Sequence, residues 1–134
     1  MVRLLEDICT KLGYKFHYGN KSHLNLIDQN GNLEPNKIHL LLFPVTRGNK
    51  DFSNSSRVYS GNFFFVMPDE FANHYEQKYT TKIEPLEGAL ALLEERLSYC
   101  ENIDVVQLNS IDAVDVLDAN MSGLWVTYQF RLYE

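Results

Sequence analysis

The sequence has little cysteine. Cys9 and Cys100 are the two cysteines among 134 residues, whereas a scaffold stabilised by disulfides needs several pairs. Both fall on the apolar face of a predicted helix, where a thiol is usually buried and unreactive. We therefore expect two reduced thiols, with a disulfide between them as the less favoured alternative.

The chain also lacks long hydrophobic runs, a secretion signal and an excess of basic residues. No stretch approaches the ~20 apolar residues of a membrane span. Arg3, Glu6 and Asp7 lie where a signal peptide would have its apolar region. The formal net charge of −6 argues against the broad basic surface that nucleic-acid binding needs. We expect no membrane partner, no direct nucleic-acid partner and no secretion.

Motifs for catalysis and metal binding are missing as well. The sequence contains no G-x-S-x-G elbow, no P-loop and no dinucleotide glycine pattern. Its four histidines lack the i, i+4 spacing that places two imidazoles on one helix face; they are His17, His23, His39 and His74. The aspartates at 112, 115 and 118 lack the glycine of a calcium loop. We therefore expect no catalytic residue, cofactor or metal site.

The longest regular pattern is the apolar stripe of residues 81–100. It repeats at alternating spacings of three and four, which predicts one face of a long helix; its members are Ile83, Leu86, Leu90, Leu93, Leu97 and Cys100. Thr81 and Glu84 have the spacing of a capping box, and Pro85 is tolerated in a first turn. Residues 2–12 predict a second, shorter helix that ends at Gly13.

Most other segments predict strands. Residues 14–18 alternate, residues 38–45 are continuously apolar as in a strand covered on both faces, and residues 58–67 return after a polar segment, with a bulge or bend expected at Gly61. From Gly123 the last strand alternates cleanly. Residues 23–28 and 103–108 predict further strands, while residues 109–120 suit either a strand or a helical turn.

These elements predict an α+β fold of one domain, residues 1–134. Strands occur in hairpin runs and one long helix intervenes, which favours a mostly antiparallel mixed sheet of five to six strands. The helix of residues 81–100 is expected to cover this sheet, with the short N-terminal helix of residues 2–12 beside it.

The polar segment of residues 46–57 is the first candidate interaction site. It holds a cationic cluster around an aromatic residue: Arg47, Lys50, Phe52 and Arg57. Arginine and aromatic residues are favoured anchors in protein interfaces, so the segment is either a docking arm or simply a soluble hairpin tip or mobile loop.

Trp125 and Tyr133 are the second candidate. They share the outer face of the last strand, opposite Leu124, Val126 and Tyr128, which should pack under the main helix. Two large aromatic residues on that face predict either a subunit contact or a second core layer under the helix of residues 2–12. The second alternative is favoured because that helix also needs a surface to cover.

Together these segments resemble the small tail-terminator, tail-completion and head–tail joining proteins of tailed bacteriophages and prophages. The resemblance rests on element order and size over nearly the full length. The segments that show it are the short N-terminal helix, the strands IHLLLFPV and VYSGNFFFVM around a long polar loop, the helix TKIEPLEGALALLEERL and the closing strand GLWVTYQFRL. No short motif is specific to the family, and the long gap between Met67 and the main helix departs from its simplest pattern.

The resemblance implies a non-enzymatic structural protein that forms a homo-oligomeric ring at a phage tail end or head–tail junction. Its partners would be copies of itself and other virion proteins, in the bacterial cytoplasm or the virion. A small monomeric binding or adaptor module encoded on a mobile element is the alternative. An enzyme is the third, and a cluster of His17 and His39 with an aspartate would favour it.

Overall fold

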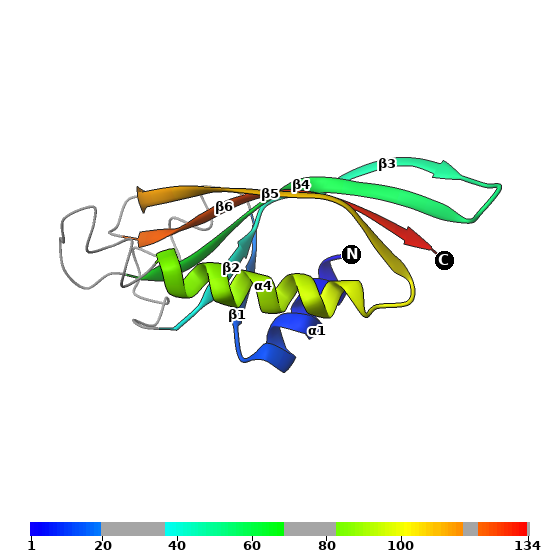
Figure 1. Cartoon of the computed structure of the whole chain (residues 1–134). Coiled ribbons are helices and arrows are strands. Elements are labelled where there is room, and N and C mark those ends of the chain that lie inside the picture. Colours follow the sequence, from blue (N-terminus) through cyan, green and yellow to red (C-terminus); the bar gives the residue numbers. More distant parts are fainter. Residues whose placement is uncertain (20–36, 69–82, 117–120, 134) are drawn as a thin grey trace.

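The computed structural model describes residues 1–19, 37–68, 83–116 and 121–133. Two helices and a six-stranded sheet make up these residues, and both helices lie on one face of the sheet (Figure 1). The fold is therefore α+β with a mixed sheet, as predicted. Within the described ranges, no helix is long and apolar enough to cross a membrane.

The N-terminal helix α1 spans Val2–Leu12, as predicted. Its buried residues are Leu5, Ile8 and Cys9, which lie on one face because they are three and four positions apart. Gly13 ends the helix in the left-handed conformation at φ 81°, and the next amide, of Tyr14, donates to the carbonyl of Cys9 at 2.8 Å. Glycine adopts this conformation without a Cβ clash.

The main helix α4 spans Glu84–Ser98 and has 15 residues, so the prediction of one long helix over residues 81–100 was wrong in length. Ile83 is the N-cap residue and no side chain caps it, whereas Thr81 lies outside the described residues. Pro85 is in the first turn, as expected. Five of the six predicted stripe residues are buried: Ile83, Leu86, Leu90, Leu93 and Leu97. Cys100 lies after the end of the helix and is only partly buried, so its prediction as a buried helix residue was wrong.

The strands run in the order β1-β2-β4-β6-β5, and β3 pairs with β4. β1 and β2 are parallel, while the other pairs are antiparallel. Their bounds are Lys15–Tyr18 for β1, His39–Leu42 for β2, Thr46–Asp51 for β3, Ser56–Pro68 for β4, Ile103–Val116 for β5 and Met121–Tyr133 for β6. The expected mixed, mostly antiparallel sheet is confirmed for these strands.

β2 and β3 both pair with β4, one after the other along the same side of it. All four residues of β2 are buried, which confirms the expected strand covered on both faces. Residues 43–45, which include Pro44, separate β2 from β3, because proline cannot donate to the ladder. β3 and the first half of β4 form a hairpin that extends beyond the helices (Figure 1).

β6 lies between β4 and β5 and alternates as predicted. Its buried residues belong to the same core as α1 and α4; they are Leu124, Val126, Tyr128 and Phe130. The ambiguous residues 109–116 are strand, because β5 continues along β6 as far as Val116. Two irregularities in register, at Val105/Gln107 and at Ala113/Val116, interrupt the alternation of side chains along β5. The sequence pattern therefore did not predict the whole strand.

Gly61 does not mark a bulge, since the register of β4 against β6 is continuous through it. A Cβ atom at Gly61 would instead lie 2.8 Å from the Tyr128 hydroxyl oxygen, so the glycine makes room for that ring. The expected strand at residues 23–28 lies outside the described residues.

Two glycine-to-alanine substitutions should change stability in opposite directions. A Cβ atom at Gly123 would clash with the carbonyl oxygen of Phe65, so Gly123→Ala must shift the backbone and should lower the free energy of unfolding by about 1–3 kcal/mol. A Cβ atom at Gly88 in α4 would have no other atom within 4 Å, so Gly88→Ala should raise the free energy of unfolding by about 0.5–1 kcal/mol. Urea unfolding of both variants measures the difference. Equal urea midpoints for the two variants would contradict the close contact of Gly123 with Phe65.

Candidate interaction surface

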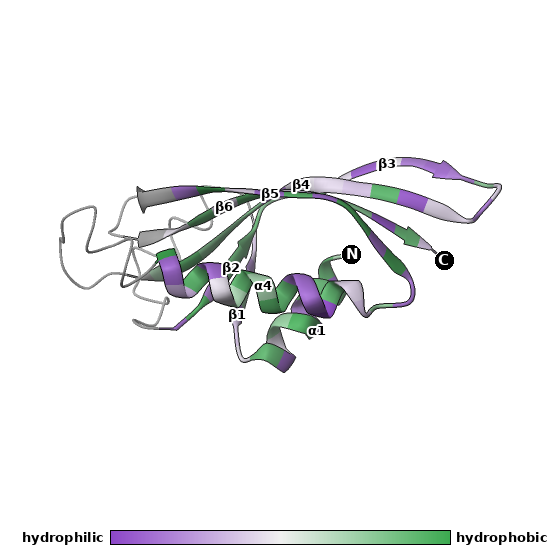
Figure 2. Ribbon diagram, in the orientation of Figure 1, coloured by the Kyte–Doolittle hydropathy of each residue, from purple (hydrophilic) through white to green (hydrophobic). Residues whose placement is uncertain are grey.

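The first candidate segment is an ordered hairpin arm, defined here as residues 46–57. It comprises β3, a four-residue turn and the start of β4. Its polar character distinguishes it from the rest of the sheet (Figure 2). The expected hairpin tip is therefore confirmed, and its backbone pairing accounts for the order: Thr46 pairs with Ser60 and Asp51 with Ser56.

Side chains of the turn hold its backbone. The Asp51 carboxylate accepts hydrogen bonds from the Ser53 amide at 3.0 Å and from the Ser53 hydroxyl at 2.6 Å. The Asn54 side-chain oxygen accepts from the Ser56 hydroxyl at 2.6 Å. The bonds from Ser53 hold the pKa of the Asp51 carboxyl below its ordinary value, because they favour the charged form. The turn thus keeps its bonds at neutral pH and loses them only as the pH falls through that lowered pKa.

Phe52 projects from this turn with 85% of its surface exposed. Arg47, Lys50 and Arg57 share the helix-side face of the arm, because Arg47 pairs with Tyr59 and Lys50 with Arg57. The Nε atom of Arg57 is buried and has no hydrogen-bond partner within the described part of the chain. The structure therefore places all four predicted residues on one arm, with the aromatic residue at its end.

The opposite edge of the sheet is acidic. β5 pairs only with β6 among the described strands, and it is a long edge strand with exposed apolar side chains at Val105, Val106 and Ile111. Asp104 and Asp112 are its described charges, and both are exposed. Edge strands usually carry lysine, proline or other protection against pairing with another chain, and this edge has neither lysine nor proline. The sequence predicted a strand only as far as residue 108, so it did not show that these residues lie along one edge strand.

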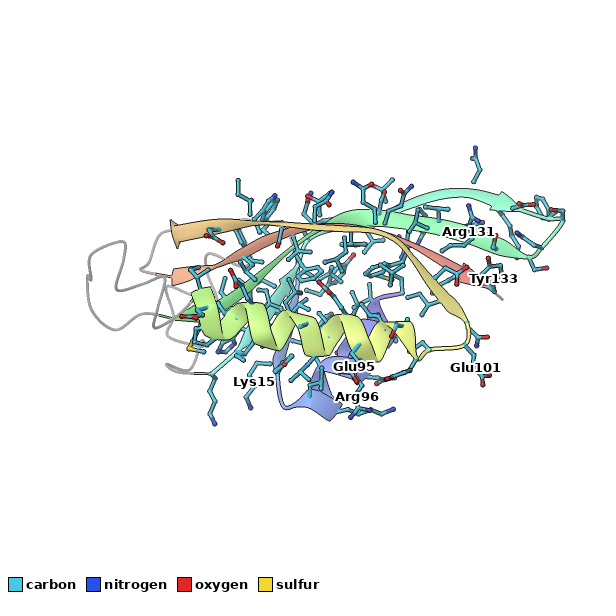
Figure 3. All side chains as sticks on the ribbon, viewed as in Figure 1. Lys15, Glu95, Arg96, Glu101, Arg131 and Tyr133 are labelled. Atoms are coloured by element: carbon cyan, nitrogen blue, oxygen red, sulfur yellow. The ribbon has the colours of Figure 1, made fainter. Side chains whose placement is uncertain are left out.

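A groove of about 520 Å³ opens beside the start of β5. Leu4, Ile103 and Leu132 give it an apolar lining, and Cys100 and Glu101 line it from the connection after α4. Glu101 and Tyr133 lie at the same end of the molecule as the arm (Figure 3). This volume falls in the range of about 300–1,000 Å³ that is typical of small-molecule pockets. One aromatic side chain would therefore fit.

Trp125 and Tyr133 are not covered by α1, so that prediction was wrong. α1 lies on the same face of the sheet as α4 (Figure 1), where its apolar residues join the core. On the outer face Trp125 packs against Phe43 and Phe64, with ring centroids 5.3 Å and 4.3 Å away. The Tyr133 hydroxyl donates to Asp104 at 2.9 Å. The two residues thus belong to separate groups on that face.

Two histidines meet on the sheet. His17 Nε2 and His39 Nδ1 are 3.1 Å apart, and the rings are stacked with centroids 5.3 Å apart. Sequence analysis missed this contact because it depends on the parallel pairing of β1 with β2. His39 is buried, with 1% of its surface exposed, and the contact with His17 gives its ring a local hydrogen bond. His23 and His74 lie outside the described residues.

The histidine pair does not form a metal-binding cluster with a third ligand in the ranges that the structure describes, where no group of three or more His, Cys, Asp or Glu residues is suitably placed. No protein-family model matches the chain, and the comparison with curated proteins finds no relative.

The two thiols should differ in reactivity. Burial raises the pKa of the Cys9 thiol to about 12, so at pH 8 almost none of it is the reactive thiolate. Cys100 is partly exposed and lines the groove. Iodoacetamide at pH 8 should therefore modify Cys100 at least about tenfold faster than Cys9, which should react only after unfolding in urea. Peptide mass spectrometry measures both rates, Cys100→Ser is the control, and equal rates in the folded protein would contradict the burial of Cys9.

Proposed function

We propose that this protein is a non-enzymatic structural subunit that assembles head to tail with copies of itself into a ring. A ring of this kind would serve at the end of a phage tail or at the head–tail junction, in the bacterial cytoplasm or the virion, with other virion proteins as further partners. The resemblance in element order suggested this class. The observation that carries the proposal is that one sheet has two exposed edges of opposite charge.

The charge difference lies between β3 and β5. β3 has two positive residues, Arg47 and Lys50, and one negative residue, Asp51, whereas the described charged residues of β5 are both negative. Complementary charges favour the pairing of unlike edges and disfavour the pairing of two copies of the same edge. An interface between unlike surfaces is heterologous, and such an interface closes into a ring when the rotation between subunits permits.

Strand direction is compatible with this arrangement. β3, β4, β6 and β5 alternate in direction, because each neighbouring pair is antiparallel. A second copy placed beside the first in the same orientation would therefore align its β5 antiparallel to β3. Antiparallel pairing would satisfy the backbone groups of both edges. The exposed Val105 and Val106 would be buried against the neighbour.

The solution mass is the first test. Light scattering over a range of protein concentrations should show a discrete oligomer at low salt and smaller species at high salt, because salt screens the attraction between exposed charges. A monomer at every concentration and salt would contradict self-assembly. It would favour instead the adaptor that uses its arm on a host protein.

A lysine in the β5 edge should prevent assembly. Val106→Lys places a charge on the proposed edge, and we expect the concentration needed for assembly to rise at least about tenfold, equivalent to ~1.4 kcal/mol. Leu92→Lys is the matched control, because Leu92 lies on α4 and is 50% exposed against 52% for Val106. Circular dichroism should show both variants folded. Equal assembly of the two variants would exclude β5 as the interface.

A further inference from the structure

The arm and the groove are complementary to each other. The arm ends in an exposed phenyl ring beside cations, and the groove is apolar with Glu101 on its lining. We propose that Phe52 of one copy inserts into the groove of the neighbouring copy, lined there by Leu4, Ile103 and Leu132. This inference rests on the head-to-tail assembly proposed above and specifies its central contact.

Phe52 does not reach the groove of its own chain. The groove borders the start of β5, and Phe52 lies in the turn between β3 and β4. β6 and the rest of β4 lie between them in the strand order, and adjacent strands are ~4.8 Å apart. The residues that line the groove do not include Phe52. The ring is therefore available to a second molecule.

The register of the sheet brings the two features together between copies. Lys50 pairs with Arg57, Arg57 with Leu132, and Leu132 with Ile103, so these four residues form one row across the helix-side face. If the next copy continues this row, Lys50 lies beside the neighbour's Ile103. Phe52 begins the turn two residues further along the chain, so it comes near the neighbour's Glu101, two residues before Ile103.

The charges around this contact also match. Lys50 would lie diagonally across from Glu101 of the next copy, and Arg47 would lie along the same acidic edge. An aromatic anchor in an apolar pocket, bordered by opposite charges, is the usual composition of an interface hot spot. The hydrogen bonds from Ser53 to Asp51 hold the turn before contact, which reduces the entropy lost on docking.

Cys100 in the groove allows a direct test by crosslinking. Phe52→Cys places a thiol on the arm, and diamide oxidises two thiols to a disulfide by accepting their two electrons and two protons. We expect a disulfide between residue 52 of one copy and Cys100 of the next, seen as covalent dimers and longer ladders on non-reducing gels and located by peptide mass spectrometry. Phe52→Cys removes the phenyl ring and could therefore weaken assembly. Ser53→Cys is the second variant, because it keeps the ring, and its residue 53 should form a disulfide with Cys100 of the next copy.

Three controls separate the outcomes. Adding Cys100→Ser should abolish the crosslink, and a covalent dimer that persists would mean tip-to-tip contact between two residues 52 and would overturn the inference. Leu92→Cys should not crosslink, because α4 presents that residue away from the core. Phe52→Ala should raise the assembly concentration at least about tenfold, whereas Leu92→Ala, which truncates an exposed apolar residue of α4, should leave it within about twofold.

The result also distinguishes the inference from the proposed function. An oligomer that forms normally in Phe52→Ala and gives no 52–100 disulfide in either cysteine variant would overturn the insertion of Phe52 while leaving head-to-tail assembly intact. A chain that stays monomeric at all concentrations would overturn both.

Discussion

The pairing of β4 with β6 is the contact on which the rest of the structure depends. It joins thirteen residue pairs without interruption, from Ser56 with Tyr133 to Pro68 with Met121. The other described strands are attached to these two: β2 and β3 to β4, β5 to β6, and β1 to β4 through β2. Helix α4 then packs on the buried alternate residues of both, such as Phe63 and Val126. Removing this ladder would leave neither a core nor an arm.

Composition changes along this ladder, and the change separates core from surface. At the Phe65 end the helix-side residues are large and apolar and lie in the core with both helices. At the other end the helices stop and the same face carries Arg57 and Tyr59, which are partly exposed (Figure 1). One strand thus serves both as core and as arm. A substitution that changes a charge in the arm should therefore not affect the packing around α4, because different residues of β4 form the arm and the core.

Much of this fold could be predicted from local patterns. The alternation of β6 and the Gly13 stop of α1 involve neighbours in sequence, so periodicity detected them. Three features could not be predicted, since each depends on residues far apart. The contact of His17 with His39 requires the parallel pairing of β1 and β2. That α1 does not cover Trp125 follows from its position on the same face of the sheet as α4. The irregular register of β5 made its full length unpredictable. Of the candidate site, the arm could be recognised by composition, whereas the groove arises only where α1, the end of α4 and β6 meet.

The continuous ladder of β4 has a mechanical consequence. In an antiparallel pair the backbone hydrogen bonds run perpendicular to the strands, so a force that pulls the arm along its axis would load the bonds between β4 and β6 in shear. All thirteen pairs would then share the load, instead of opening one after another from an end. Tension on the arm would therefore pass directly into the strand that also anchors the core.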